Sequence, residues 1–130
     1  MTVTIEAVSL LVFEAADCLM AVPASEVSHL KDDPDTYKKR VRPVFGGDTF
    51  DLGEYFGGRQ SDGPWLRWGR GTRSAWLRVR HVVDVVPVAI SVLTPMPSVF
   101  RRQVRTHAFL AAGVCGDDVF LLLDPARLTS

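Results

Sequence analysis

Residues 116–128 read GDDVFLLLDPARL, and residues 47–56 carry a shorter version of the same phrase, GDTFDLGEYF. Each copy begins with Gly-Asp, which favours a turn, and continues with apolar residues suited to a strand. Each then reaches an aspartate, Asp51 or Asp124, placed to cap a helix, and Pro125 follows where the first helical position tolerates proline. The two copies predict two small β-subdomains related by an approximate two-fold, an architecture typical of scaffolds and rarely of catalysts.

The size and charge of the chain agree with one compact unit. It has 130 residues, of which 47% are hydrophobic, so we expect a single domain covering residues 1–130 with a sizeable core. Fifteen Lys and Arg side chains balance fifteen Asp and Glu side chains. The balanced charge gives no overall field that would attract nucleic acid or a membrane surface.

The cysteines and the N-terminal sequence indicate in which cellular compartment the protein is found. Cys18 and Cys115 both lie in apolar, strand-like runs, which favours two buried thiols over a disulfide or a reactive site. The N-terminus lacks a basic segment, and no apolar run approaches the roughly 18 residues of a membrane-spanning helix. We therefore expect a cytoplasmic protein that does not insert directly into a membrane.

Signals for β-structure dominate the first half of the chain. Residues 8–22 predict an antiparallel hairpin that turns at residues 14–17, because two apolar runs flank a short polar segment. Pro23 is expected to open a short helical stretch, with Ala24, Val27 and Leu30 on its apolar side.

The second half contains the clearest hairpin, formed by residues 65–68 and 75–81. Period-two alternation places Trp68 on an apolar face and turns Trp76 away from Leu77. Residues 82–88 continue as a strand whose proline suggests an edge or a bulge, and two further runs near the C-terminus should pair with each other. The expected fold class is all-β with short helical turns, and the residues predicted to be buried are Phe13, Val22, Leu77, Val79, Phe120 and Leu122.

Motifs for catalysis or metal binding are not found in the sequence. His29, His81 and His107 are scattered without the spacing of a zinc site, and no nucleophile motif or phosphate-binding loop occurs. We therefore predict no enzyme, no metal site and no cofactor. Small barrels that bind single-stranded nucleic acid combine cationic and aromatic side chains, and residues 65–80 contain a similar set of arginines and tryptophans. Interspersed carboxylates and the burial expected for Trp68 make nucleic-acid binding the weaker alternative.

Five segments together resemble CheW-like domains. Residues 10–13 (LLVF) and 20–27 (MAVPASEV) are similar to the opening strands of that family, and residues 50–52 (FDL) to its central element. Residues 93–97 (LTPMP) resemble its proline pair, and residues 113–128 its closing strand and helix. The resemblance rests on the order and spacing of these segments over nearly the whole chain.

The resemblance implies two intertwined, SH3-like, five-stranded β-barrels that share a hydrophobic core. It also implies a non-catalytic adaptor of a bacterial chemosensory array, which couples methyl-accepting chemotaxis receptors to a CheA-type histidine kinase. In such adaptors the receptor tip occupies the groove between the barrels. Carried onto this sequence, the receptor-binding residues are Glu26, Val27 and His29, with Val27 supplying apolar contact. A plain core position for Val27 is the alternative.

One segment departs from the family pattern. Between Leu30 and Asp51 the chain is shorter than the family pattern and carries a basic cluster instead. The residues of this cluster, predicted to contact the kinase or other CheW-like partners, are Lys38, Lys39, Arg40 and Arg42. We expect the shortening to weaken contact with the kinase. The alternative function is a CheW-like interaction module in a motility or polarity complex outside chemotaxis.

Overall fold

The computed structural model describes residues 6–31, 48–97 and 106–128, which form two β-sheets with short helical turns between them. The larger sheet has six strands in the order β7-β1-β2-β10-β9-β8. Their bounds are His81–Ala89 (β7), Ala7–Ala15 (β1), Cys18–Pro23 (β2), Asp118–Leu123 (β10), Phe109–Cys115 (β9) and Thr94–Pro95 (β8). The all-β prediction is confirmed.

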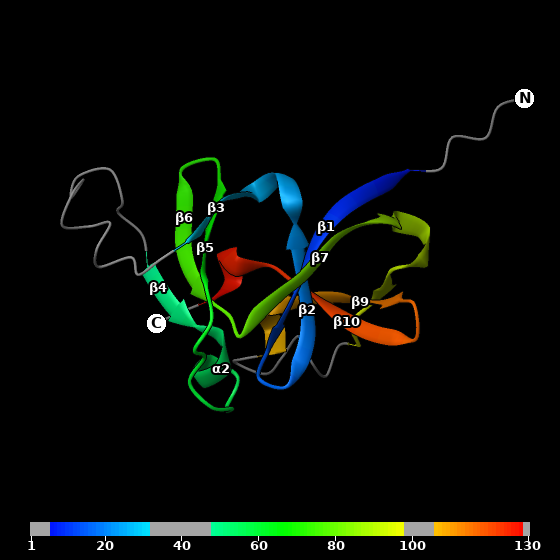
Figure 1. The fold of residues 1–130 in the computed structure, drawn as a ribbon. Helices are drawn as coiled ribbons and strands as arrows, with labels where there is room; N and C mark the ends of the chain where they lie inside the picture. Colours follow the sequence, from blue (N-terminus) through cyan, green and yellow to red (C-terminus); the bar gives the residue numbers. More distant parts are fainter. Residues whose placement is uncertain (1–5, 32–47, 98–105, 129–130) are drawn as a thin grey trace, which may run out of the picture.

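The smaller sheet has four strands in the order β3-β5-β6-β4, and Figure 1 shows it beside the larger one. Its strands are Val27–Lys31 (β3), Trp65–Arg70 (β5), Arg73–Arg78 (β6) and Asp48–Asp51 (β4). The helical elements are α2 (Leu52–Tyr55) and the 3-10 turns η1 (Ala24–Glu26), η2 (Ile90–Val92), η3 (Thr106–Ala108) and η4 (Pro125–Arg127). The described strands divide six and four, where five and five were expected, because the two-residue β8 pairs with β9 and extends the larger sheet.

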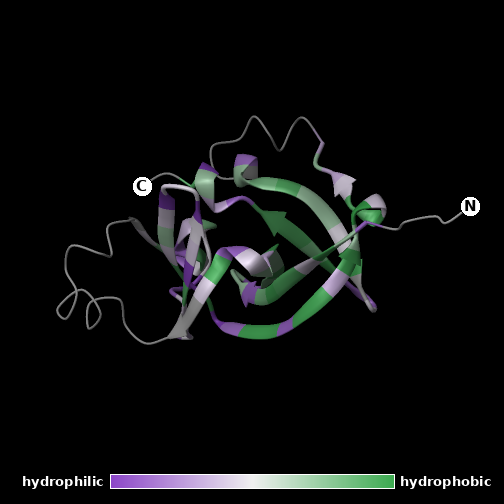
Figure 2. Ribbon diagram, turned by 90° about the horizontal axis from the view of Figure 1, so that it is seen from above, coloured by the Kyte–Doolittle hydropathy of each residue, from purple (hydrophilic) through white to green (hydrophobic). Residues whose placement is uncertain are grey.

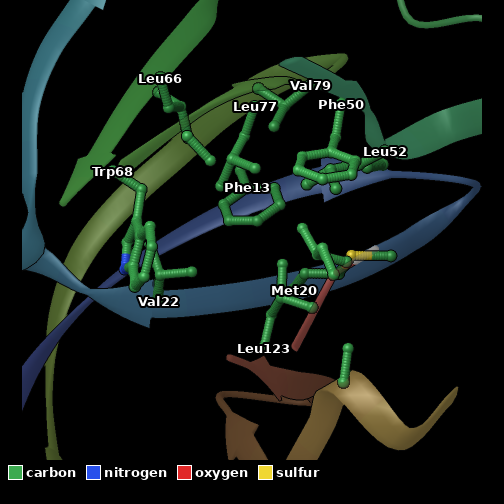
Figure 3. Packing of buried hydrophobic residues seen from close by; sticks show 14 of the residues in the cluster. Phe13, Met20, Val22, Phe50, Leu52, Leu66, Trp68, Leu77, Val79 and Leu123 are labelled. Carbon is green, nitrogen blue, oxygen red and sulfur yellow. The ribbon is translucent and has the colours of Figure 1, made fainter. Parts of the chain in front are cut away.

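The main hydrophobic core lies between the two sheets (Figure 3). Its largest contributors are Phe13, Met20 and Val22 from the larger sheet and Leu66, Trp68 and Leu77 from the smaller one. A second cluster, which includes Leu10, Val12 and Phe120, covers the other face of the larger sheet. Because β1 is buried on both faces, residues 10–13 read as an unbroken apolar run. Figure 2 shows long hydrophobic stretches, coloured green, in some of the strands and more polar colouring in others.

Both predicted hairpins are confirmed. β1 pairs antiparallel with β2 through a turn at Ala16 and Asp17, whose positive φ angles of 51° and 60° suit a tight two-residue connection. β5 pairs antiparallel with β6 around a turn that contains Gly71 at φ 61°. β9 and β10 pair as expected, and β7 lies at the edge of its sheet.

The repeated phrase builds the same unit in both sheets. β4 pairs in parallel with β6, and β10 pairs in parallel with β2, whereas the other described pairings are antiparallel. β4 and β10 each lead to an aspartate that caps the next helical turn. Asp51 accepts a hydrogen bond from the Glu54 amide, and Asp124 accepts one from the Ala126 amide. The two-fold relation between the copies stays a prediction.

Three local predictions need correction. The helical stretch after Pro23 ends at Glu26, because pairing with β5 draws the following residues into β3. Cys18 is exposed, since it is the first residue after the β1–β2 turn, whereas the side chain of Cys115 lies outside the described part. Leu122 is half-buried, because it packs at the border of the smaller apolar cluster.

The other five residues of the predicted core are buried, with Phe13, Val22, Leu77, Val79 and Phe120 each at 0% exposure. Trp76 faces away from Leu77 as alternation requires, yet it is only 1% exposed. The Arg67 guanidinium lies 5.9 Å from its ring centroid. A tryptophan on the outward face of the smaller sheet is therefore covered and does not offer a stacking platform.

Candidate partner-binding site

The residues predicted to meet a receptor lie where the chain passes from the larger sheet to the smaller one. β2 ends at Pro23, whose φ of −56° and lack of an N–H suit the start of η1. Glu26 is the last residue of η1, and Val27 begins β3 directly after it. In Figure 1 this short link connects the tops of β2 and β3.

The Glu26 carboxylate is held by two neighbours from β5. Trp68 Nε1 donates to Oε1 over 2.9 Å. The Arg70 guanidinium donates in a forked arrangement, from Nε to Oε2 over 2.8 Å and from Nη2 to Oε1 over 3.0 Å. Two-pronged contacts between arginine and a carboxylate are among the strongest hydrogen bonds in proteins. Glu26 is thus engaged inside the molecule.

Arg70 also reaches the C-terminal end of the larger sheet. Its Nη1 donates to Asp124 Oδ1 over 3.2 Å, and the same carboxylate oxygen accepts a hydrogen bond from the amide of Ala126, the second residue of η4. Arg73 adds a bond of 2.7 Å from Nη2 to the Ala126 carbonyl. The β5–β6 hairpin of the smaller sheet is therefore tied to the residues that follow β10 of the larger one. We call Glu26, Trp68, Arg70 and Asp124 the intersheet clamp.

The opposite charges of Glu26 and Arg70 reinforce the clamp. The hydrogen bond from Arg70 lowers the pKa of Glu26 below its ordinary range, with smaller effects from burial, which opposes the shift, and from Trp68. The same bond raises the pKa of Arg70, so the guanidinium stays charged. Arg70 also lies 5.4 Å from the Trp68 ring centroid, a distance suited to a cation–π contact.

Val27 combines contact with the core and partial exposure. Its backbone lies opposite Trp68 in the pairing of β3 with β5, and its half-buried side chain packs against the main core. The next residue, Ser28, is exposed and directs its hydroxyl toward the Arg67 carbonyl at 3.5 Å. Val27 can therefore contribute to the core and still present surface to a partner.

The remaining predicted site residues are only partly covered by the structure. The His29 backbone pairs with Arg67 in the smaller sheet, and its side chain lies outside the described part. The basic cluster Lys38, Lys39, Arg40 and Arg42 also lies outside the described residues.

Sequence reasoning missed the clamp. It identified Asp124 as a helix cap but did not connect it with Arg70, 54 positions away, or connect Glu26 with Trp68, 42 positions away. No local pattern reports such pairs, because they depend on how the two sheets pack. The only signal was the unusual density of charged residues beside tryptophans in the β5–β6 hairpin.

Over residues 6–31, 48–97 and 106–128, no group of three or more His, Cys, Asp or Glu side chains is arranged to hold a metal ion. His81 Nε2 instead lies 3.2 Å from Glu14 Oε2 at the surface. In the same part of the chain, no helix is long and apolar enough to cross a membrane.

The fold just described is CheW-like, with two β-sheets sharing one core. Among solved structures, the scaffolding protein TtCheW from Thermoanaerobacter tengcongensis is similar to this chain, with a TM-score of 0.68 and 19% sequence identity. The alignment covers 91% of this chain and 89% of that protein. Searches of family models and of curated proteins give no match.

Proposed function

We infer that this protein is a non-catalytic adaptor in a bacterial chemosensory array and that it binds the tips of methyl-accepting receptors. The observation that carries this inference is the likeness to a scaffolding CheW protein over nine-tenths of both chains. Because a shared fold by itself does not fix function, the further support comes from the sequence segments that resemble the family. Two sheets that share one core offer such a protein two surfaces for two partners.

The receptor surface that we infer centres on Val27, with Glu26 and His29 beside it. Glu26 already binds Trp68 and Arg70, so its role is to hold the link in place. Val27 then supplies the apolar contact, since its side chain is half-buried at the start of β3. Burying the exposed part of an apolar side chain against a partner removes it from water, which favours binding.

We infer that this protein binds the kinase more weakly than other CheW-like adaptors do. The segment between Leu30 and Asp51 is short and basic, with Lys38, Lys39, Arg40 and Arg42 replacing the usual sequence. A partner surface shaped for that usual sequence would meet unmatched charges that must lose their water. Transient interfaces near the lower end of about 1,200 Å² have little contact area to spare. Such an adaptor would link receptors to one another or act beside a full-length adaptor.

The experiment for the receptor surface compares Val27→Asp with Ser28→Asp. Both variants add one carboxylate at neighbouring positions, but Ser28 is exposed and packs no core residue. We expect Val27→Asp to abolish binding to a purified receptor-tip fragment while Ser28→Asp changes it little, with cooperative unfolding retained in both.

Global unfolding of the Val27→Asp variant would indicate that Val27 is a core residue. Val27→Thr then decides the role, because threonine keeps the side-chain shape and replaces one methyl group with a hydroxyl. Unchanged receptor binding by a folded Val27→Thr or Val27→Asp protein would contradict the proposed surface.

A further inference from the structure

Strand β7 forms one edge of the six-stranded sheet. It pairs with β1 on one side, and none of the described strands pairs with its other side. Val83 and Val85 on this strand are 51% and 49% exposed. A nine-residue edge strand with exposed valines would ordinarily invite pairing with another strand.

The direction of each backbone N–H in β7 follows from its pairing with β1. The Ile90 amide donates to the Glu6 carbonyl over 3.0 Å, which makes these two residues a hydrogen-bonded pair. From there the register is regular up to the pair of Asp84 with Val12. Antiparallel strands alternate hydrogen-bonded and non-hydrogen-bonded pairs. At Val85 and Pro87 the backbone nitrogen and the carbonyl group therefore point away from β1, toward the open edge.

Both of these central positions lack a free donor. Pro87 has no N–H. The Val85 amide donates to the Asp84 carboxylate, Oδ1, over 2.7 Å. Asp84 itself is exposed, so its carboxylate lies at the surface beside the edge. The middle of the β7 edge thus offers carbonyl acceptors but no donor to an incoming strand.

We propose that Asp84 and Pro87 keep the outer edge of β7 closed to a second copy of this chain. The edge is self-complementary: an antiparallel copy centred on Val85 would place Val85 against its own counterpart and Val83 against Pro87. That arrangement would cover the exposed valines and exchange two backbone hydrogen bonds at the two-fold axis. The two Val85 amides are the donors it needs, and Asp84 occupies them.

The test uses Asp84→Ala, Asp84→Asn and the double variant Asp84→Ala/Pro87→Val. Asp118→Ala serves as the control, because it also removes an exposed carboxylate from a strand but frees no edge donor. Sedimentation velocity over a concentration series gives the association constant. Amide hydrogen exchange at residue 85 reports whether β7 is the surface used, even if the protein associates through another surface.

We expect self-association to strengthen about tenfold or more in Asp84→Ala, and further in the double variant, with slowed exchange at Val85 as the concentration rises. Asp84→Asn and Asp118→Ala should behave like the wild type, since asparagine keeps an oxygen acceptor for the Val85 amide. Two results would overturn the proposal: a folded double variant with unchanged association and exchange, or association of Asp84→Asn equal to that of Asp84→Ala.

Discussion

The intersheet clamp is open to a ranked mutational test at Glu26 and Arg70. Arg70→Ala removes three side-chain hydrogen bonds, two to Glu26 and one to Asp124. Bonds to charged groups contribute about 1.5–3 kcal/mol each when well shielded, but exposed ion pairs contribute only about 0.2–1 kcal/mol. Because the Arg70 side chain is 46% exposed, we expect the whole substitution to cost about 1–2 kcal/mol.

Glu26→Ala should cost more than Arg70→Ala. It removes the same pair and also leaves Trp68 Nε1 without its acceptor, and Trp68 is only 1% exposed. A buried donor left unpaired adds about 1–3 kcal/mol. Glu26→Gln keeps an oxygen for Trp68 and should be the mildest of the three. The predicted order of destabilisation is therefore Glu26→Ala, then Arg70→Ala, then Glu26→Gln.

Urea unfolding measures these free energies, and the double variant Glu26→Ala/Arg70→Ala measures their coupling, which we expect to be about 1 kcal/mol. Arg59→Ala is the control, since Arg59 is exposed and has no ion pair among the described residues. Added salt should reduce the cost of Arg70→Ala more than that of Glu26→Ala, because the Trp68 bond is not an ion pair. Equal costs for Glu26→Ala and Glu26→Gln, or additive single effects, would refute the clamp.

Three further predictions concern the smaller apolar cluster and acid stability. Phe120→Ala should cost about 3–5 kcal/mol by leaving a cavity, and a loss below about 1 kcal/mol in a denaturant titration would contradict its core role. Gly113→Ala should cost about 1–3 kcal/mol, since its new methyl would lie 2.4 Å from the Phe120 ring, but much less in the Phe120→Ala background. Glu26 has a lowered pKa when folded, so its stabilisation is present above its ordinary value of 4.5 and is lost as pH falls through the folded value. The stability difference between the wild type and Glu26→Gln should shrink with acid, and a difference independent of pH would contradict this.

Local sequence signals account for most of the fold. Two apolar runs around residues 14–17 predicted the first hairpin, and alternating strands around the glycines at 69 and 71 predicted the second. The aspartate caps followed from their spacing to the next residues. The prediction failed where tertiary pairing overrides local preference. A helical spacing after Pro23 gave way to β3 because a strand there completes the pairing with β5. Cys18 is exposed because its position at a turn outweighs its apolar neighbours.

The candidate site was only partly visible in the sequence. Glu26 and Val27 were identified through the family resemblance, but the partners that fix Glu26 lie more than 40 positions away. A carboxylate near the start of a strand gives no indication of whether it faces a binding partner or an internal arginine. These two roles are distinguished only by the packing of the β5–β6 hairpin against the residues that follow β2 and β10 of the larger sheet.

Calorimetric titration of the purified protein, separately with a receptor-tip fragment and with the regulatory domain of a CheA-type kinase, tests the adaptor role. We predict measurable binding to the receptor tip that Val27→Asp abolishes, together with weak or undetectable binding to the kinase domain. Micromolar or tighter binding to the kinase domain would contradict the weakened contact and indicate a conventional receptor–kinase coupler. Absence of binding to both partners by the folded protein would contradict the adaptor role itself.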